Sequence, residues 1–486
     1  MAARLYPRSG PIAKKQPIFV EAAFWQPLGP WVEGKKKGLI GAGRQMWPYN
    51  FKGMMRGGWL TAGDAERRSS AMDAMMVRKR RLERLLELAQ AYRGWSRKEL
   101  ARTLGRDPTK LVPGTGIPKL DLVVHLSGVL DWPVGDVVAF LWDHDRPQSQ
   151  ADDAKDFQVL DEEARQAHRV GQYELMAQLA QEAYTVATTP EERARACNRQ
   201  AGAWDGLGRY TEVLKSVNRG MQETGVSLDF RRMLQSNLAN AYYCLWSLVE
   251  SRSVSQDLIR WFEDHPPQTA RDRKTSAFAH YVSGHSYRRL LSVEPDRSRE
   301  LAALAREDLQ VAHTSYLQLA KELGDESLEG IANTCYGGLI EADVELGRRS
   351  ATDALGELSK GLDEVLDTSE AVVGDRLESY GWWCIFGCNI ALRHLSNERD
   401  LQQHMAVLTN KADEIANQLD NWAMRERVFT MHYTRWERAT GSTGFDIPCV
   451  IDTDDVRIIT GTMGRFPTFR DTGWRILQSA QVVDGN

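Results

Sequence analysis

Cysteine is scarce in this sequence of 486 residues, and no two cysteines form a Cys-x-x-Cys pair. The six cysteines are Cys197, Cys244, Cys335, Cys384, Cys388 and Cys449. Cys384 and Cys388 lie one helical turn apart, which is more typical of a packed helix face than of a metal or redox pair. Scattered thiols in so large a chain indicate a reducing compartment rather than a disulfide framework, so we expect a cytoplasmic protein.

Long apolar runs are also missing. The mean hydropathy is −0.45, and no apolar run approaches the roughly 18 residues that a membrane-spanning helix needs. The first residues lack an apolar core followed by a small-residue cleavage site, so no cleavable signal is predicted. We therefore expect no membrane partner.

The common catalytic motifs are absent as well. The sequence has no Gly-x-x-x-x-Gly-Lys-Ser/Thr loop, no Gly-x-Gly-x-x-Gly, no His-Glu-x-x-His and no Gly-x-Ser-x-Gly. Ten histidines are spread without ligand spacing; His280 and His285, for example, are five positions apart, which does not suit one helical face. The sequence therefore predicts no catalytic residue, no metal site and no cofactor, and we do not expect an enzyme.

Positive charge is concentrated near the N-terminus. Residues 77–110 contain eleven Lys or Arg against four Asp or Glu, and residues 1–76 contain twelve against five. Each stretch thus has a net charge of +7, whereas the whole chain has −4, which leaves −18 for residues 111–486. A basic module followed by an acidic body is the charge distribution expected of a protein that contacts nucleic acid through one module.

The basic stretch and its continuation to Trp142 show helical patterns. Ser96 and Glu99 have the spacing of a capping box, which predicts a second helix that ends at Gly105. Pro118 then opens a longer apolar stretch. The apolar positions that recur at helical spacing are Leu82, Leu85, Leu86 and Ala89 before the capping box, and Leu100, Ala101 and Leu104 after it.

Two pieces of this stretch, WSRKELARTLG and PKLDLVVHLSGVLDWPVGDVV, resemble the lambda-repressor-like (XRE) helix-turn-helix family. The family pairs a Q-x-E-L-A-x-x-L-G unit with a later P-x-L-x-x-L-x-x-L-A-x-x-L-x-V unit, and Arg97 stands where Gln is usual. The resemblance implies that residues 77–145 form a domain that binds double-stranded DNA, as a homodimer because one module buries too little surface for high specificity.

Between these two pieces the sequence departs from the family pattern. Only twelve residues separate Gly105 from Pro118, so a recognition helix has room only from Asp107 to Val112. Pro113 and the following glycines end any helix there. A helix this short can still reach a major groove, or it is a remnant that only packs. The candidate DNA contacts are Arg97, Lys98 and Arg102 for phosphates, and Arg106, Thr109 and Lys110 for base edges.

The segments on either side of this domain look irregular. Residues 1–76 mix proline, glycine and lysine without a period, which predicts a disordered basic arm. A second interpretation is a misassigned start, because Glu66-Arg67-Arg68 can be encoded with a ribosome-binding sequence a few codons before Met72. Residues 146–159 are rich in aspartate and predict an acidic linker.

Residues 160–440 read as helices with a loose internal repeat. GQYELMAQLAQEAY begins at Gly171 and GRYTEVLKSVNRGM at Gly208, 37 positions later. The next piece, SNLANAYYCL, resembles the first helix of a tetratricopeptide (TPR) repeat. That resemblance implies an α-solenoid whose concave face holds a peptide or protein ligand. Asn237, Asn240 and Tyr243 would line this face, unless the two amides only satisfy groups between repeats.

The tail, residues 441–486, interleaves basic and aromatic residues. Such a segment can bind nucleic acid, but docking onto the acidic body is the interpretation we favour. Taken together, the sequence predicts an all-α protein with a disordered N-terminal arm, a helix-turn-helix domain and a TPR-like α-solenoid. The predicted function is a DNA-binding transcriptional regulator that senses a peptide or protein; the alternative is an interaction scaffold with a degenerate helix-turn-helix and no DNA binding.

Overall fold

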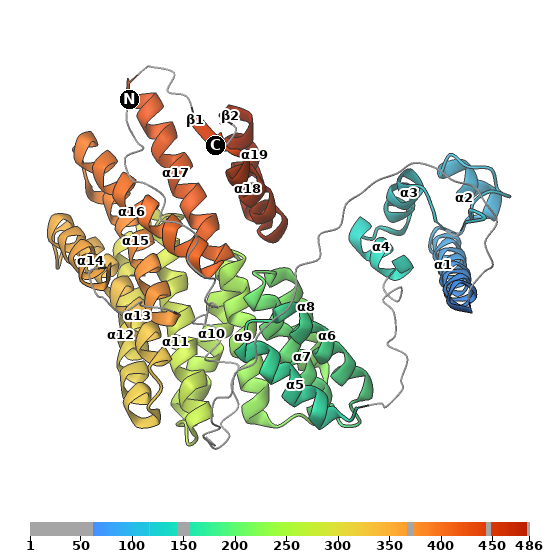
Figure 1. Cartoon of the computed structure of the whole chain (residues 1–486), viewed down its shortest axis with the longest axis horizontal. Helices are drawn as coiled ribbons and strands as arrows, with labels where there is room; N and C mark the ends of the chain where they lie inside the picture. Colours follow the sequence, from blue (N-terminus) through green and yellow to red (C-terminus); the bar gives the residue numbers. More distant parts are fainter. Residues whose placement is uncertain (1–61, 116, 143–154, 367–373, 444–448, 484–486) are drawn as a thin grey trace. The chain divides into compact units, whose positions relative to one another are not determined.

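The computed structural model describes residues 62–115, 117–142, 155–366, 374–443 and 449–483. The chain divides into two compact units, one within residues 32–154 and one made mostly of residues 155–486. Nearly every described element is a helix, which confirms the expectation of a helical protein (Figure 1). Within these ranges, no single helix is long and apolar enough to cross a membrane; only the pair α3 (Leu120–Leu130) and α4 (Val134–Trp142), bent by 116°, meets that test jointly.

The N-terminal unit contains four helices around one apolar core: α1 (Ala62–Arg93), α2 (Arg97–Thr103), α3 (Leu120–Leu130) and α4 (Val134–Trp142). The predicted capping box is present, since the Ser96 hydroxyl accepts from the Glu99 N–H and the Glu99 carboxylate accepts from the Ser96 N–H. All the apolar positions predicted on either side of it are buried. The helical spacing therefore identified the core of this unit correctly.

The first helix begins earlier than the sequence suggested. Helix α1 starts at Ala62, inside the segment expected to be a disordered arm, and continues without a break past Met76. No proline or glycine interrupts residues 64–93, so nothing in the chain stops the helix there. The remainder of the expected arm, residues 1–61, lies outside the described residues, as does most of the expected acidic linker.

The predicted recognition helix over Asp107–Val112 is wrong. These residues form turns, and the Asp107 carboxylate accepts from the Thr109 backbone N–H at 2.8 Å and from the Thr109 hydroxyl. Such a local side-chain bond competes with helical hydrogen bonding. Leu111 is fully buried and anchors the turn to the core. A compact turn therefore stands between α2 and α3 where a helix was expected.

The second unit is an array of antiparallel helix hairpins, and neighbouring helices lie side by side in chain order (Figure 1). The odd-numbered helices also pack on one another and form an inner layer, while the even-numbered helices lie outside. The inner helices are α5 (Phe157–Arg169), α7 (Pro190–Gly206), α9 (Leu228–Cys244), α11 (Ala270–Leu290), α13 (Ser327–Glu345), α15 (Asp375–His394) and α17 (Trp422–Thr443). The outer helices are α6 (Tyr173–Val186), α8 (Tyr210–Gln222), α10 (Leu248–Asp264), α12 (Ser298–Leu323), α14 (Ala351–Leu366) and α16 (Glu398–Leu419).

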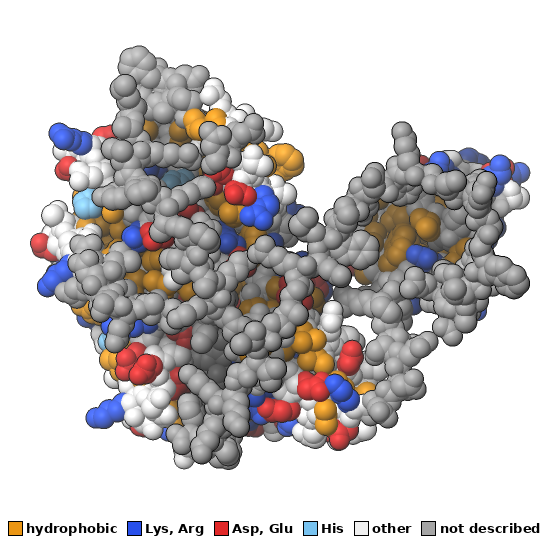
Figure 2. Space-filling view, in the orientation of Figure 1, with side chains coloured by type: hydrophobic (Ala, Val, Ile, Leu, Met, Phe, Trp, Pro, Cys, Tyr) orange, Lys and Arg blue, Asp and Glu red, His pale blue; other side chains and the backbone are white. Residues whose placement is uncertain are grey.

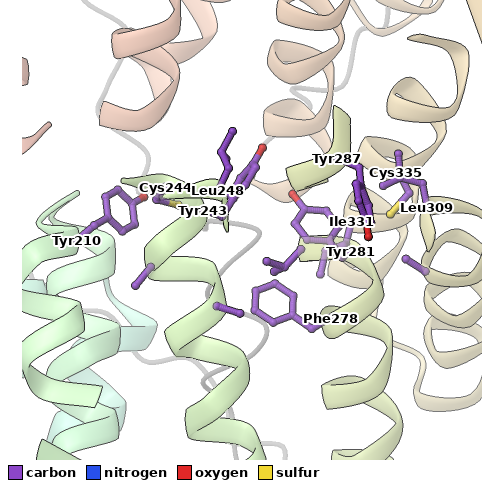
Figure 3. Close-up of a cluster of buried hydrophobic side chains, with 14 of the residues drawn as sticks. Tyr210, Tyr243, Cys244, Leu248, Phe278, Tyr281, Tyr287, Leu309, Ile331 and Cys335 are labelled. Atoms are coloured by element: carbon purple, nitrogen blue, oxygen red, sulfur yellow. The ribbon is translucent and has the colours of Figure 1, made fainter. Parts of the chain in front are cut away.

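The two layers differ in what they bury. Outer helices such as α8 and α10 bury one apolar stripe, and the visible surface of the body carries acidic and basic side chains interspersed (Figure 2). Inner helices such as α11 are buried along most of their surface, and aromatic residues from α9 and α11 fill the space between them (Figure 3). Phe278 and Tyr281, for example, stack with ring centroids 5.7 Å apart. The inner layer is therefore the core of the body.

The C-terminal segment packs against the body. It contains β1 (Cys449–Asp452), α18 (Thr453–Arg465), a short 3-10 turn, α19 (Arg470–Ser479) and β2 (Ala480–Val483), and the two strands pair in parallel. Phe466 is buried with its ring 5.8 Å from Tyr210, and Arg465 donates to the Leu207 carbonyl at 3.0 Å. Burial of aromatic rings and a hydrogen bond from Arg465 to the backbone thus both contribute to this packing.

Buried charges link three inner helices. Glu341 of α13 is fully buried and accepts from Arg288 of α11 at 2.9 Å and from Arg393 of α15 at 2.6 Å. A buried carboxylate is tolerated only when cations or donors surround it. This triad therefore fixes the relative positions of α11, α13 and α15.

Replacing the central carboxylate tests this role. We expect Glu341→Ala to lower the free energy of unfolding by about 3 kcal/mol, because the buried Arg288 guanidinium loses its carboxylate partner while Arg393 keeps only Glu345. The matched control is Glu300→Ala, which removes an exposed carboxylate that pairs with Arg297 and should cost less than about 1 kcal/mol. Urea unfolding followed by circular dichroism measures both; equal costs would contradict a structural role for the triad.

Candidate functional site

The first candidate site is the basic surface of α2 and the turn that follows it. Arg97, Lys98, Arg102 and Lys110 are exposed, and Lys and Arg side chains gather over this part of the unit (Figure 2). The Arg97 guanidinium donates to the Pro108 carbonyl at 3.3 Å, which holds the start of α2 beside the turn. The fold therefore brings these predicted DNA contacts into one region of the surface.

Two predicted contacts differ in their availability. Arg106 is half-buried and forms an ion pair with Asp121 of α3, so its charge is partly neutralised. Thr109 is exposed, but its hydroxyl donates to the Asp107 carboxylate. Because residues 107–112 are a turn, neither side chain projects from a helix as the sequence had suggested.

The second candidate site was expected at Asn237, Asn240 and Tyr243 of α9. Asn237 and Asn240 are 4% and 7% exposed, so the expectation of surface amides is wrong for both. The Asn237 amide donates to the Asn198 side-chain carbonyl at 3.1 Å, which joins α9 to α7. Asn237 therefore faces a neighbouring inner helix, because α9 is buried along most of its surface. Of the three residues, Tyr243 alone lines the cavity described next.

Two adjoining cavities lie within the inner layer. The smaller, of about 30 Å³, is lined by residues that include Tyr243, Tyr281 and Asp205. The larger, of about 210 Å³, is lined by residues of α11, α15 and α17 and by Trp246 after α9. Arg289 and Trp382 line both cavities, so the two adjoin at these residues.

Arginine dominates the charge of the larger cavity. Its lining contains four arginines and no acidic side chain: Arg288, Arg289, Arg393 and Arg427. Arg288 and Arg393 share Glu341 behind the lining, whereas Arg289 donates to the Tyr243 backbone carbonyl at 2.6 Å. Burial lowers the pKa of Arg427 against the opposing effect of the neighbouring Glu426 carboxylate, and the charges of Arg289 and Arg288 lower it further. The cavity is thus a cationic space within an acidic body.

A strained residue lies beside these arginines. Trp246 has a φ of 64°, in the left-handed region that large side chains rarely adopt. The Arg289 and Arg427 guanidinium carbons each lie 4.6 Å from the centre of a Trp246 ring. Trp246 follows α9 at the position where Gly171 follows α5 and Gly208 follows α7, both also with positive φ. The turn therefore holds an indole where its geometry favours glycine.

The backbone hydrogen bonds show that the turns at Gly171, Gly208 and Trp246 have the same conformation. The N–H of the left-handed residue bonds three residues back and the next N–H bonds five residues back, as in Gly208 to Asp205 and Trp246 to Tyr243. The sequence carried a signal for this, because Trp246 occupies the glycine position of the Gly-x-Tyr repeat one unit later. The sequence-based interpretation of the repeat did not assign Trp246 to this position.

Comparisons with known proteins do not assign the chain to a family. No protein-family model matches the chain, and no curated protein matches it.

The strain at Trp246 leads to a test with two variants of one position. We expect Trp246→Gly to be more stable than Trp246→Ala by about 1 kcal/mol, because glycine adopts positive φ at low cost. Both variants lose the same indole contacts, so the difference between their free energies of unfolding isolates the backbone. Equal stabilities would show that the turn is not strained.

The buried amide of Asn237 gives a second test. We expect Asn237→Ala to lower the free energy of unfolding by about 1–3 kcal/mol, because the buried Asn198 carbonyl loses a donor. The control is Asn218→Ala on the exposed side of α8, which should change stability by less than about 0.5 kcal/mol. Thermal melting of both variants provides the measurement, and an unchanged melting temperature for Asn237→Ala would argue for a surface role.

Proposed function

We propose that this protein is a DNA-binding transcriptional regulator whose helical body senses a peptide or protein ligand. The observation that carries the proposal is the cluster of exposed cations on α2 and the adjoining turn, in a stretch with a net charge of +7. Contacts between such cations and phosphates supply most of the affinity of proteins for DNA. We include a homodimer and a cytoplasmic location in the proposal, since one small module buries too little surface for specific binding alone.

The roles of the candidate residues follow from their positions. Arg97, Lys98 and Arg102 bind phosphates along α2, whereas Thr109 and Lys110 approach base edges from the turn. A turn presents fewer side chains to a groove than a recognition helix does, so we expect strong phosphate binding with modest sequence preference. Arg106 contributes less, because Asp121 already offsets its charge.

The layered array of helices supports the sensing part of the proposal. Peptide-binding sites in helical arrays lie on the inner helices, where side chains from several repeats converge. Tyr243, which the sequence predicted at the ligand face, borders the smaller cavity, but a space of about 30 Å³ is too small for a peptide. A peptide ligand would therefore contact inner helices of several repeats outside this cavity, and its binding energy would be available to change their packing.

The second candidate function is an interaction scaffold without DNA binding. The turn at residues 107–112 favours it, because a helix-turn-helix without a recognition helix has lost the element that normally enters the major groove. The scaffold and the regulator share the helical body and differ only in what the N-terminal unit does.

Salt dependence of DNA binding separates the two functions. We expect the full chain to bind a labelled duplex of mixed sequence with an affinity that falls with salt concentration. Lys98→Ala and Arg102→Ala should each reduce the slope of log affinity against log salt by about one unit, because each removes a phosphate contact. Fluorescence anisotropy at several salt concentrations provides the measurement.

The control for this experiment is Lys215→Ala, which removes an exposed lysine of the acidic body and should leave the slope unchanged. Replacing Thr109 or Lys110 should alter the preference among duplex sequences more than the slope. Absent or salt-independent binding by the wild-type chain would overturn the regulator and leave the scaffold.

A further inference from the structure

The larger cavity is lined by four arginines, and the carboxylates that pair with them leave Arg289 without an acidic partner among the described residues. Residues 111–486 carry a net charge of −18, yet the charged groups that line this cavity are all guanidinium groups. Like charges this close repel one another, and burial increases the cost of each charge. A protein that only needed to fill this space would be more stable with apolar side chains. Three carboxylates pair with these cations: Glu341 with Arg288 and Arg393, Glu345 with Arg393, and Glu426 with Arg427. Among the described residues no carboxylate pairs with Arg289, so its charge is the one that an anion would compensate.

Arg289 has N–H donors that no described hydrogen bond uses. Its guanidinium group is 6% exposed and donates to the Tyr243 carbonyl, and the structure describes no other hydrogen bond from its five N–H groups. Its carbon lies 3.6 Å from the centre of the Tyr243 ring, so stacking fixes the plane of the guanidinium group. A guanidinium group that is held in one plane and has unused N–H donors can bind a carboxylate or phosphate through two parallel hydrogen bonds.

Arg427 lies on the opposite helix, α17, and is also weakly paired. The nearest acidic oxygen in the described ranges belongs to its neighbour Glu426, at 3.5 Å, and that carboxylate also accepts from the Thr430 hydroxyl. Arg289 and Arg427 are both in contact with the Trp246 indole. The strained turn therefore holds the Trp246 indole against the guanidinium groups of Arg289 and Arg427.

We propose that this cavity binds a small organic anion, whose carboxylate or phosphate group pairs with Arg289 and Arg427 beside the indole of Trp246. The space of about 210 Å³ corresponds to roughly fifteen water-sized volumes, which suits a small di- or tricarboxylate or a phosphorylated metabolite. Ser292, Asn389 and Thr434 line the same space and offer hydroxyl and amide groups for the remainder of the ligand. This site lies in the helical body and does not depend on whether the N-terminal unit binds DNA.

Two anions serve as probes of the full chain. Citrate represents a carboxylate ligand and inorganic phosphate a phosphate ligand, each compared with chloride at the same ionic strength and pH. Isothermal titration calorimetry measures their affinities, and thermal melting measures the stabilisation that binding produces. We expect at least one of the two to bind the wild-type chain at millimolar concentration, and the stronger of the two identifies the anionic group.

The variants are Arg289→Gln and Arg427→Gln, each expected to weaken binding of that anion at least about tenfold, the loss typical of a charged hydrogen bond. The control is Arg306→Gln on the outer helix α12, where Arg306 pairs with Asp343; its affinity should equal that of the wild type. If a Gln variant fails to fold, Arg289→Lys or Arg427→Lys replaces it. Lysine keeps the positive charge but cannot form the bidentate hydrogen bond of the guanidinium group. Absence of binding of both anions to the wild type, or equal binding by the cavity variants, would overturn the proposal.

Discussion

Buried charge is the constraint on which the helical body depends. Its inner helices are covered along most of their surface, so a charged side chain that they bury needs a polar partner, often from a neighbouring helix. Glu341 meets this need for Arg288 and Arg393, and Asp161 of α5 meets it for Arg199 of α7, at 2.7 Å. Each such pair joins inner helices from different hairpins. The packing order of the body is therefore specified by polar contacts as well as by apolar area.

The same constraint distinguishes the candidate ligand site from the rest of the core. Arg289 is buried and has no carboxylate partner among the described residues, and Arg427 pairs only with its neighbour Glu426 at 3.5 Å. Both contact Trp246, whose φ of 64° is unfavourable for a large side chain. Strained backbone persists at positions where the surrounding structure requires a particular side chain. Weak pairing and strain thus coincide at one point of the inner layer, and the ligand binding that we propose accounts for both.

The sequence predicted those features that depend on nearby residues. Helical spacing and the Ser96–Glu99 capping box identified α2 and its core, because both signals act within one or two turns. The recognition helix was predicted wrongly because the bonds from Asp107 to Thr109 stabilise a turn instead. Asn237 was assigned to the ligand face because repeat spacing does not reveal how deeply an inner helix is covered. The arginine cavity was missed because α9, α11, α15 and α17 supply its residues, and no local pattern joins positions so far apart in the chain.

The central claim is that α2 and the following turn contact DNA while the helical body does not. Hydrogen exchange of the full chain, followed by mass spectrometry with and without a duplex, tests it most directly. The account predicts slower exchange of the backbone amides of residues 96–110 when DNA is present, and unchanged exchange in the inner helices of the body. Unchanged exchange over residues 96–110 at saturating duplex would contradict it.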